Sequence, residues 1–332
     1  MRGDILKKKL MVLCAVAIMI STCLTGCKMN SGKIRFGSAG IGGTYQIFGD
    51  TFANLISSKS KKYNIEVKTT AGSAANLRLL SKDYIQMAVA QMDLINDAYN
   101  RTGIFENDKK YQGYRAVASL YTEACQIVVP ADSDIQSMDD LEGKKVCIGE
   151  EESGTEQNAL QILNAYGLNE RLVDTVNLNY TDAAKKLKSG DIDAFFCTAG
   201  VQTTVINELS KQCKIRLVSL DQKGVSRLKK SYENFYTEYT IPAGTYVNQT
   251  KEIKTVGVKA VLLASDKLSE DTVKDITQIL FKNQQQIQYA LPVDISLDET
   301  TAVDGITIPF HDGAAAYYKQ HGITVNTEKG SN

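Results

Sequence analysis

The sequence has no tryptophan, four prolines and two histidines among its 332 residues. Both histidines, His311 and His321, lie near the C-terminus and away from every glycine-rich turn, so a Ser–His or Cys–His catalytic pair has little support. Basic and acidic residues balance at 38 each, and no basic stripe indicates a nucleic acid partner. These absences argue against a nucleophilic hydrolase and against a nucleic-acid-binding protein.

Nucleotide and metal motifs are also missing. The turn Gly40-Ile-Gly42-Gly43-Thr44-Tyr45 has a tyrosine where a dinucleotide fingerprint requires its third glycine, and no Gly-Lys-Ser/Thr phosphate loop occurs. The four cysteines after position 27 lack metal-type spacing. Cys125, Cys147 and Cys197 lie in apolar runs, which favour buried free thiols over a single disulfide bridge, and Cys213 lies outside such a run. We therefore expect no cofactor and no metal.

The N-terminal segment predicts export. Four basic residues precede an apolar run at 10–20 that is too short to span a bilayer, which is typical of a secretory signal peptide over residues 1–26. The sequence Leu24-Thr-Gly-Cys27 is typical of a bacterial lipobox, so we expect lipid on Cys27 and a polar tether over 27–32. Ordinary signal cleavage, with Cys27 incidental, is the alternative. We expect an extracytoplasmic protein that is anchored to the bacterial cell membrane by this lipid.

Beyond residue 33, short apolar runs alternate with amphipathic stretches. Strands are predicted at 34–37, 65–70, 87–91, 115–121, 126–130, 145–149, 173–177, 194–198, 215–219 and 255–264. Helical spacing occurs at 46–55, 75–80, 156–165, 182–188, 201–211 and 270–290. Such alternation predicts an α/β fold with mostly parallel sheets and helices on both faces, in two domains rather than one.

At four places a predicted strand passes into a helix through glycine or small hydroxyl residues. These junctions are Gly42–Tyr45, Thr70–Asn76, Ser153–Thr155 and Thr198–Gly200. Each could be an ordinary helix start, since the same residue types cap helices. Ligands of open α/β sheets bind at the carboxyl ends of strands, where helix N-termini suit an anion. Two junctions in each half of the chain therefore favour a ligand cleft between two lobes.

A longer series of segments resembles one known family. The matching segments are Gly42–Tyr45, Thr69–Leu80, Met87–Gln91, Ala118–Tyr121, Asp139–Val146, Ser153–Thr155, Ile192–Phe196, Ala199–Gly200, Thr240–Tyr246, Val256–Ala260 and Pro309–Ala314. Together they span residues 34–318, and they resemble the solute-binding lipoproteins of the TAXI branch of TRAP transporters.

The resemblance implies a two-lobed, type II periplasmic-binding-protein fold. Two mostly parallel sheets flanked by helices would be joined by a double-crossover hinge near 121–130 and 239–247. Lobe one would comprise 33–124 and 244–332, and lobe two 125–243. Such a protein captures a small carboxylate or amino acid, for example glutamate, glutamine or a dicarboxylate, and delivers it to the permease subunits of a TRAP transporter.

Two alternatives to this function stay open. One is a binding lipoprotein of the same fold that serves an ABC importer or a sensor. The other is an enzyme built on this fold that uses Glu123 or Glu150. The main hypothesis requires no enzymatic activity, because capture and release involve no covalent chemistry.

Residues that match the family's motifs are the candidate ligand contacts. In lobe one they are Gly43, Thr44, Tyr45, Ser73, Asn76, Gln91, Tyr121 and Glu123, and in lobe two Ser153, Thr155, Thr198 and Gly200. Glu123 would accept a hydrogen bond from a ligand ammonium, whereas Asn76 could instead hold its own helix start and Tyr121 could pack at the hinge. Few charged residues lie at the junctions, so we expect recognition through backbone and hydroxyl groups rather than salt bridges.

Overall fold

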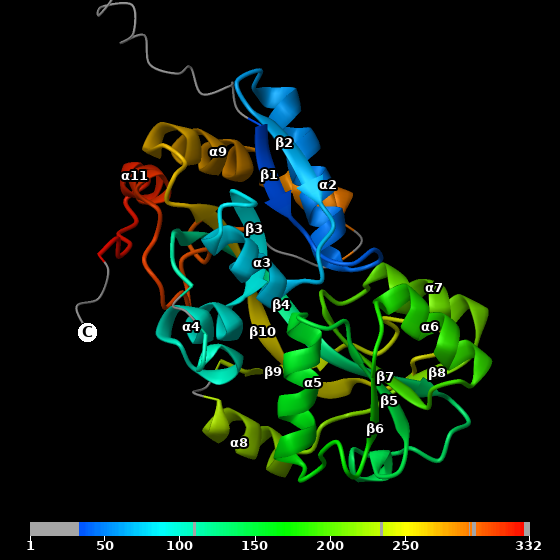
Figure 1. The fold of residues 1–332 in the computed structure, drawn as a ribbon. Coiled ribbons are helices and arrows are strands. Elements are labelled where there is room, and N and C mark those ends of the chain that lie inside the picture. Colours follow the sequence, from blue (N-terminus) through cyan, green and yellow to red (C-terminus); the bar gives the residue numbers. More distant parts are fainter. Residues whose placement is uncertain (1–32, 109–110, 233–234, 292, 294–296, 329–332) are drawn as a thin grey trace, which may run out of the picture.

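The computed structural model describes residues 33–108, 111–232, 235–291, 293 and 297–328. The predicted signal peptide (1–26), lipid site (Cys27) and tether (27–32) lie outside these residues and stay predictions. Figure 1 shows two α/β lobes joined along shared strands. Within the described ranges, no helix is long and apolar enough to cross a bilayer.

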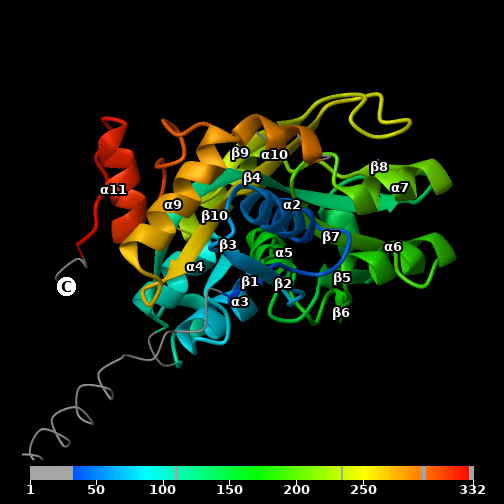
Figure 2. The same ribbon diagram turned by 90° about the horizontal axis from the view of Figure 1, so that it is seen from above.

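The first lobe is built from two distant parts of the chain. Its first part contains β1 (Lys33–Gly37), α2 (Thr44–Lys59), β2 (Asn64–Lys68), α3 (Ser73–Ser81), β3 (Met87–Gln91), α4 (Met92–Asn100), the 3-10 turn η1 (Gly103–Phe105) and the start of β4 (Tyr114–Pro130). Its second part contains the end of β10 (Ile253–Ser265), α9 (Glu270–Lys282), α10 (Gln284–Ala290) and α11 (Asp312–Gln320). Helices α9 and α11 lie on the same side of this lobe in Figures 1 and 2.

The second lobe is formed by the chain between those two parts. It contains η2 (Asp139–Leu141), β5 (Lys145–Gly149), α5 (Gly154–Ala165), β6 (Asp174–Asn177), α6 (Tyr180–Ser189), β7 (Ala194–Ala199), α7 (Thr204–Gln212), β8 (Ile215–Leu217), α8 (Gln222–Ser231) and β9 (Thr237–Ile241). Both views place α6 and α7 together at the far end from α11.

Strands β4 and β10 run through both lobes and connect their sheets. They pair antiparallel from Gly257 and Ala124 to Ser265 and Tyr114, and the strand order is β2-β1-β3-β10-β4-β7-β5-β6, with β8 beside β4 and β9 beside β10. The expectation of two mostly parallel sheets needs one correction. Among the named strands of the described chain, four pairs are parallel (β1–β2, β1–β3, β5–β6 and β5–β7), whereas β4 and β10 run antiparallel to all their neighbours.

The apolar core is divided between the lobes. One cluster draws on residues from Ile34 to Tyr121 and from Ala260 to Tyr318, and two others lie between Ala124 and Val258. The second passage of the chain between cores thus falls within β10, after the predicted crossing at 239–247. The lobe limits 33–124 with 244–332, and 125–243, stay a prediction; below, "lobe one" and "lobe two" mean the parts that surround these cores.

Strand β4 is longer than the sequence suggests. Two strands were expected at 115–121 and 126–130 because Thr122 and Glu123 interrupt the apolar run, yet β4 is continuous and Glu123 is buried. Cys125, Cys147 and Cys197 are buried free thiols, as expected from their apolar surroundings, and Cys213 is half-buried. The interruption at Glu123 marks the place where β4 passes between the lobes.

Candidate functional site

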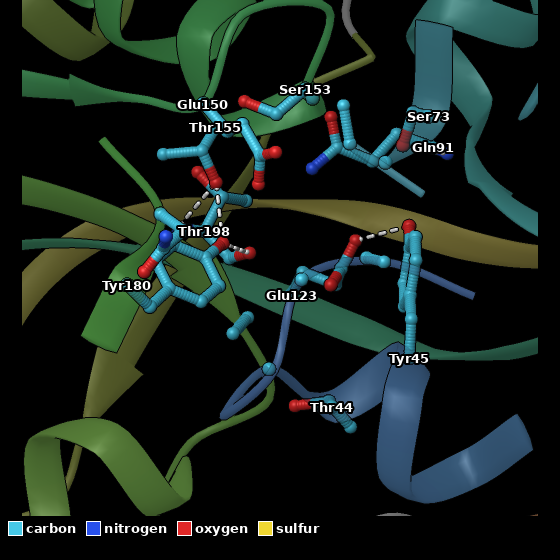
Figure 3. A pocket seen from close by; sticks show the side chains of 18 residues that line it. Thr44, Tyr45, Ser73, Gln91, Glu123, Glu150, Ser153, Thr155, Tyr180 and Thr198 are labelled. Atoms are coloured by element: carbon cyan, nitrogen blue, oxygen red, sulfur yellow. Dashed lines mark hydrogen bonds between the residues drawn. The ribbon is translucent and has the colours of Figure 1, made fainter. Parts of the chain in front are cut away.

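A cavity of about 40 Å³ lies where the two lobes meet. Figure 3 shows side chains from both lobes directed into it. The lining residues are Ala39, Gly40, Gly43, Thr44, Tyr45, Ala71, Gly72, Ser73, Gln91, Glu123, Glu150, Ser153, Gly154, Thr155, Asn179, Tyr180, Thr198 and Ala199.

Glu123 lies at the centre of the cavity and is only 2% exposed. The Tyr45 hydroxyl donates a hydrogen bond of 2.6 Å to its Oε2. Burial raises the pKa of the Glu123 carboxyl to about 8, although the Tyr45 hydroxyl and the Gln91 amide act in the opposite direction. A carboxyl in these surroundings can either bind a proton or form an ion pair with a cationic group of a ligand.

Several helices begin at the cavity wall, among them α2, α3 and α5. Thr44 is the first residue of α2, Ser73 is the first residue of α3, and Ser153 is the N-cap of α5, where its Oγ accepts a hydrogen bond of 3.0 Å from Glu156 N. The first N–H groups of a helix have no partner within the helix, and the helix dipole makes that end positive. The wall therefore suits a carboxylate.

In lobe two, the side chains of Tyr180 and Thr155 and the backbone of Thr198 hold one another in a fixed arrangement. The Tyr180 hydroxyl donates to the Thr198 carbonyl over 2.9 Å, and Thr198 N donates to Thr155 Oγ1 over 3.2 Å. Thr155 Oγ1 lies 2.5 Å from the Tyr180 oxygen and supplies the hydrogen of that contact, since the tyrosine hydrogen is used on Thr198. Figure 3 shows this group on the lobe-two side of the cavity, across from Tyr45 and Glu123.

Most of the predicted ligand residues line this cavity. The structure brings together Gly43, Thr44, Tyr45, Ser73, Gln91, Glu123, Ser153, Thr155 and Thr198. Gly200 does not line it, but its N–H donates to Thr44 Oγ1 across the lobes over 3.2 Å. Tyr121 is buried outside the lining, and its hydroxyl has no hydrogen-bond partner among the described residues.

The prediction that Asn76 faces the ligand is corrected. Its Nδ2 donates to the carbonyls of Ser38 (2.7 Å) and Val89 (2.9 Å), and its Oδ1 accepts from the Thr70 hydroxyl (2.8 Å). These bonds hold the ends of β1 and β3 together, so no polar atom of Asn76 remains for a ligand.

Tyr180 and Asn179 line the cavity but were not predicted. They belong to a fifth junction, between β6 and α6, where the Asn179 side chain caps the helix by accepting a hydrogen bond from Asp182 N over 2.9 Å. An asparagine followed three residues later by an aspartate is a recognisable helix start, and that signal could have found them.

The lobes are in contact on both sides of the cavity. On one side the hydroxyls of Thr203 and Thr181 donate to the carbonyls of Gly42 and Ile41, each over 3.3 Å. On the other, Ala75 N donates to the Glu152 carbonyl over 3.2 Å. The structure thus shows the lobes closed over the cavity.

Arg78 also reaches across the lobes. Its Nε lies 3.1 Å from Glu152 Oε1, without hydrogen-bond geometry at that nitrogen. On its own lobe it pairs with Asp108 and lies over the rings of Phe105 and Tyr111, at 5.0 and 5.3 Å from the ring centroids. These contacts orient the guanidinium toward lobe two.

The charge inside the cavity is acidic. Glu123 and Glu150 line it, and its described lining contains no lysine, arginine or histidine. Burial raises the pKa of the Glu150 carboxyl as well. Among the residues with described positions, no group of three or more His, Cys, Asp or Glu side chains could hold a metal ion. The cavity therefore offers hydrogen-bond donors at helix starts and two carboxyl groups, with no basic side chain in its described lining.

The sequence match decides the family. The family model described as "NMT1-like family" matches residues 36–322. The chain belongs to the NMT1-like family. Its matched region includes every cavity residue and both crossing strands.

Solved structures support the fold of this NMT1-like chain. A binding-protein component of an ABC phosphonate transporter from Pseudomonas aeruginosa is similar over 81% of this chain and 83% of that one, at 14% identity and a TM-score of 0.51. A putative L-cystine ABC transporter protein from Listeria monocytogenes is similar over 80% of this chain and 98% of that one, at 15% identity and a TM-score of 0.50. The predicted two-lobed, type II periplasmic-binding-protein fold is confirmed.

Proposed function

We propose that this protein is the extracytoplasmic solute-binding component of an importer and that it captures a small amino acid between its lobes. One observation carries the proposal: a buried carboxyl, Glu123, lies at the centre of a cavity that has helix starts in its wall and no basic side chain in its described lining. Capture by closure of two lobes requires no covalent step.

The charges favour an ammonium-bearing ligand over a dicarboxylate. Two unit charges about 4 Å apart interact by about 4 kcal/mol at an effective dielectric constant of about 20. A ligand ammonium favours the ionised form of Glu123 and gains an attraction of this order, whereas a second ligand carboxylate gains no such attraction. The α-carboxylate of an amino acid is served by the starts of α2, α3 and α5. Glutamine-like and glutamate-like ligands therefore remain within the proposal, and simple dicarboxylates become the weaker candidates.

The membrane partner is proposed to be the permease of an ABC-type importer. This choice is supported by the similar proteins from Listeria monocytogenes and Pseudomonas aeruginosa, both of which are described as parts of ABC transporters. The alternative is a TRAP-type permease, which the resemblance to TAXI proteins implies. Lipid on Cys27 would hold the protein at the membrane beside either kind of permease. A gene for an ATPase next to this one would support the first partner, and a gene for a fused multi-spanning permease the second.

Thermal unfolding tests the ligand class. L-Glutamine and L-glutamate are compared with succinate and glutarate, and a ligand at about a hundredfold excess over its Kd adds about 2.7 kcal/mol of stability. We expect an amino acid to raise the melting temperature and the diacids to leave it unchanged. Glu123→Gln should abolish the effect, and Glu142→Gln, which changes an exposed acid of lobe two, should retain it. Failure of every solute in the panel contradicts the proposal.

An enzyme on the same fold is the second candidate, because a carboxyl with a raised pKa is also typical of a general acid. Incubation with a bound amino acid, followed by mass spectrometry of the solute, separates the two. Turnover that disappears in Glu123→Gln while binding persists would favour the enzyme.

A further inference from the structure

A second buried polar contact joins the lobes outside the ligand cavity. Asp93 lies in the first turn of α4 in lobe one, and Asn158 lies on α5 in lobe two. Asn158 Nδ2 donates a hydrogen bond of 3.0 Å to Asp93 Oδ2. Asp93 is 4% exposed and Asn158 is fully buried, and neither lines the cavity. The two side chains can make this contact only when the lobes are closed.

This contact leaves one oxygen on each side without a hydrogen bond. Asp93 Oδ1 and Asn158 Oδ1 are both buried and have no hydrogen-bond partner among the described residues. The remaining groups of the cluster are satisfied: Asn158 Nδ2 also donates to the Tyr236 oxygen (2.8 Å), and that hydroxyl donates to Gln161 Oε1 (2.5 Å). Asp93 and Asn158 thus each keep one buried acceptor oxygen to which no group donates a hydrogen bond.

Among the described residues, the titratable groups that act on Asp93 are Asp97 on its own helix, Glu123 and Cys125 on β4, and Tyr236 beside α5, and none of these is basic. Each of them is neutral or negative. An ionised carboxyl that is buried without a cationic partner costs several kcal/mol, so the closed form favours the protonated acid.

We propose that Asp93 and Asn158 form a proton-operated latch that holds the two lobes together. In the open form, Asp93 faces water and its carboxyl is ionised. On closure, Asp93 Oδ1 takes a proton from the solvent and becomes an O–H donor. Asn158 Oδ1, which otherwise has no donor, accepts this hydrogen bond. One proton therefore completes both sides of the contact. The latch rests on the two-lobed closure of the proposed function, but not on the identity of the solute.

The sign of the pH dependence follows from burial. Burial raises the pKa of Asp93 from 3.8 to about 7, the neighbouring Asp97 adds to this effect, and the Leu94 N–H and the Asn158 amide oppose it. A group whose pKa is higher in the closed form favours closure at low pH and loses that effect as the pH rises through about 7. The closing equilibrium should rise about tenfold for each pH unit between about 7 and 4, and hence about a hundredfold from pH 8 to pH 5.

Small-angle X-ray scattering of the ligand-free protein between pH 5 and pH 8, at fixed ionic strength, tests the latch. We expect the radius of gyration of the wild type to be smaller at pH 5 than at pH 8. Asp93→Asn keeps an N–H donor at this position and cannot titrate, so its radius should change less with pH than that of the wild type. Glu123→Gln removes the other buried acid near the seam and should retain the part of the response that comes from Asp93.

Several results would overturn the latch. It is wrong if the wild-type radius does not change with pH, or if Asp93→Asn responds as the wild type does. If Asp93→Asn does not melt cooperatively, Asp93→Ala is used instead; it removes the titrating carboxyl, and a wild-type response of the radius to pH in that variant contradicts the latch. Compaction at pH 5 in a protein that binds no amino acid would reject only the proposed function, whereas amino acid binding without compaction would reject only the latch.

Discussion

The hydroxyl of Tyr45 donates a hydrogen bond of 2.6 Å to the carboxyl of Glu123, and both side chains are buried. Tyr45 lies in the first turn of α2, and Glu123 lies where β4 leaves lobe one. The bond ties the start of a helix to the strand that crosses between lobes. It also fixes the orientation of the one carboxyl at the centre of the cavity.

Tyr45→Phe should weaken amino acid binding. It removes the donor to Glu123, and hydrogen bonds to charged groups contribute about 1.5–3 kcal/mol, so we expect at least a tenfold higher Kd by isothermal titration calorimetry with L-glutamine or L-glutamate. Tyr289→Phe is the control, because Tyr289 is 88% exposed on α10 and does not line the cavity. Equal losses in both variants would contradict a specific role for Tyr45.

Glu123 should also make stability depend on pH. Its pKa is raised from 4.5 to about 8 in the folded protein, so the native state binds more protons than the unfolded state between these values. Stability should therefore fall as the pH rises from about 4.5 to about 8, by at most about 1.4 kcal/mol per pH unit from this group. Urea unfolding of the ligand-free wild type and Glu123→Gln at pH 5 and pH 8 measures the difference. A parallel decline in both would contradict this prediction.

Gly154 should be essential for closure rather than for folding. It begins α5, its backbone is compatible with any residue, and a methyl group there would overlap the Gln91 amide on the other lobe. Gly154→Ala should enlarge the radius of gyration and abolish ligand-induced stabilisation, while the circular dichroism spectrum is retained. The double variant Gly154→Ala with Gln91→Ala removes the obstruction, and its radius should return toward the wild-type value. A compact single variant would show that Gln91 moves aside.

The Arg78–Glu152 ion pair should contribute little, and only at low salt. The two side chains are 23% and 47% exposed, and exposed pairs contribute about 0.2–1 kcal/mol. Glu152→Gln should therefore raise the Kd of an amino acid ligand by about two- to fivefold at low ionic strength, with no difference at about 1 M salt. Glu151→Gln, at the neighbouring exposed position, is the control. An effect that persists at high salt would indicate a different role for Glu152.

Much of the site could be predicted because its chemistry is local. Thr44, Ser73, Ser153 and Thr155 were found because small hydroxyl residues at strand–helix junctions start helices, and helix starts converge at the carboxyl ends of the strands. Tyr180 was missed because the junction at Asn179 was not counted with the others. The contact of Asp93 with Asn158 was beyond sequence reasoning, since the residues are 65 positions apart and belong to different lobes.

The direction of a side chain was harder to predict than its position. Asn76 lies at a junction, as expected, but its amide completes backbone hydrogen bonds of β1 and β3, which only the packed sheet brings together. Glu123 broke the apolar pattern of β4 and divided one strand into two in the sequence prediction. The break in the pattern was a sign of the site and not of a strand end.

The long pairing of β10 has a consequence for the order in which the protein forms. Residues 87–91 of β3 pair with residues 260–264 of β10, from which they are separated by about half of the chain. Until β10 has been synthesised, the inner edges of β3 and β4 have no partner. The core residues of lobe two end at Val258, so its supporting contacts can form as soon as the chain reaches β10. Because distant contacts form slowly, lobe one should be the last part to complete its fold, even though its first strand opens the described chain.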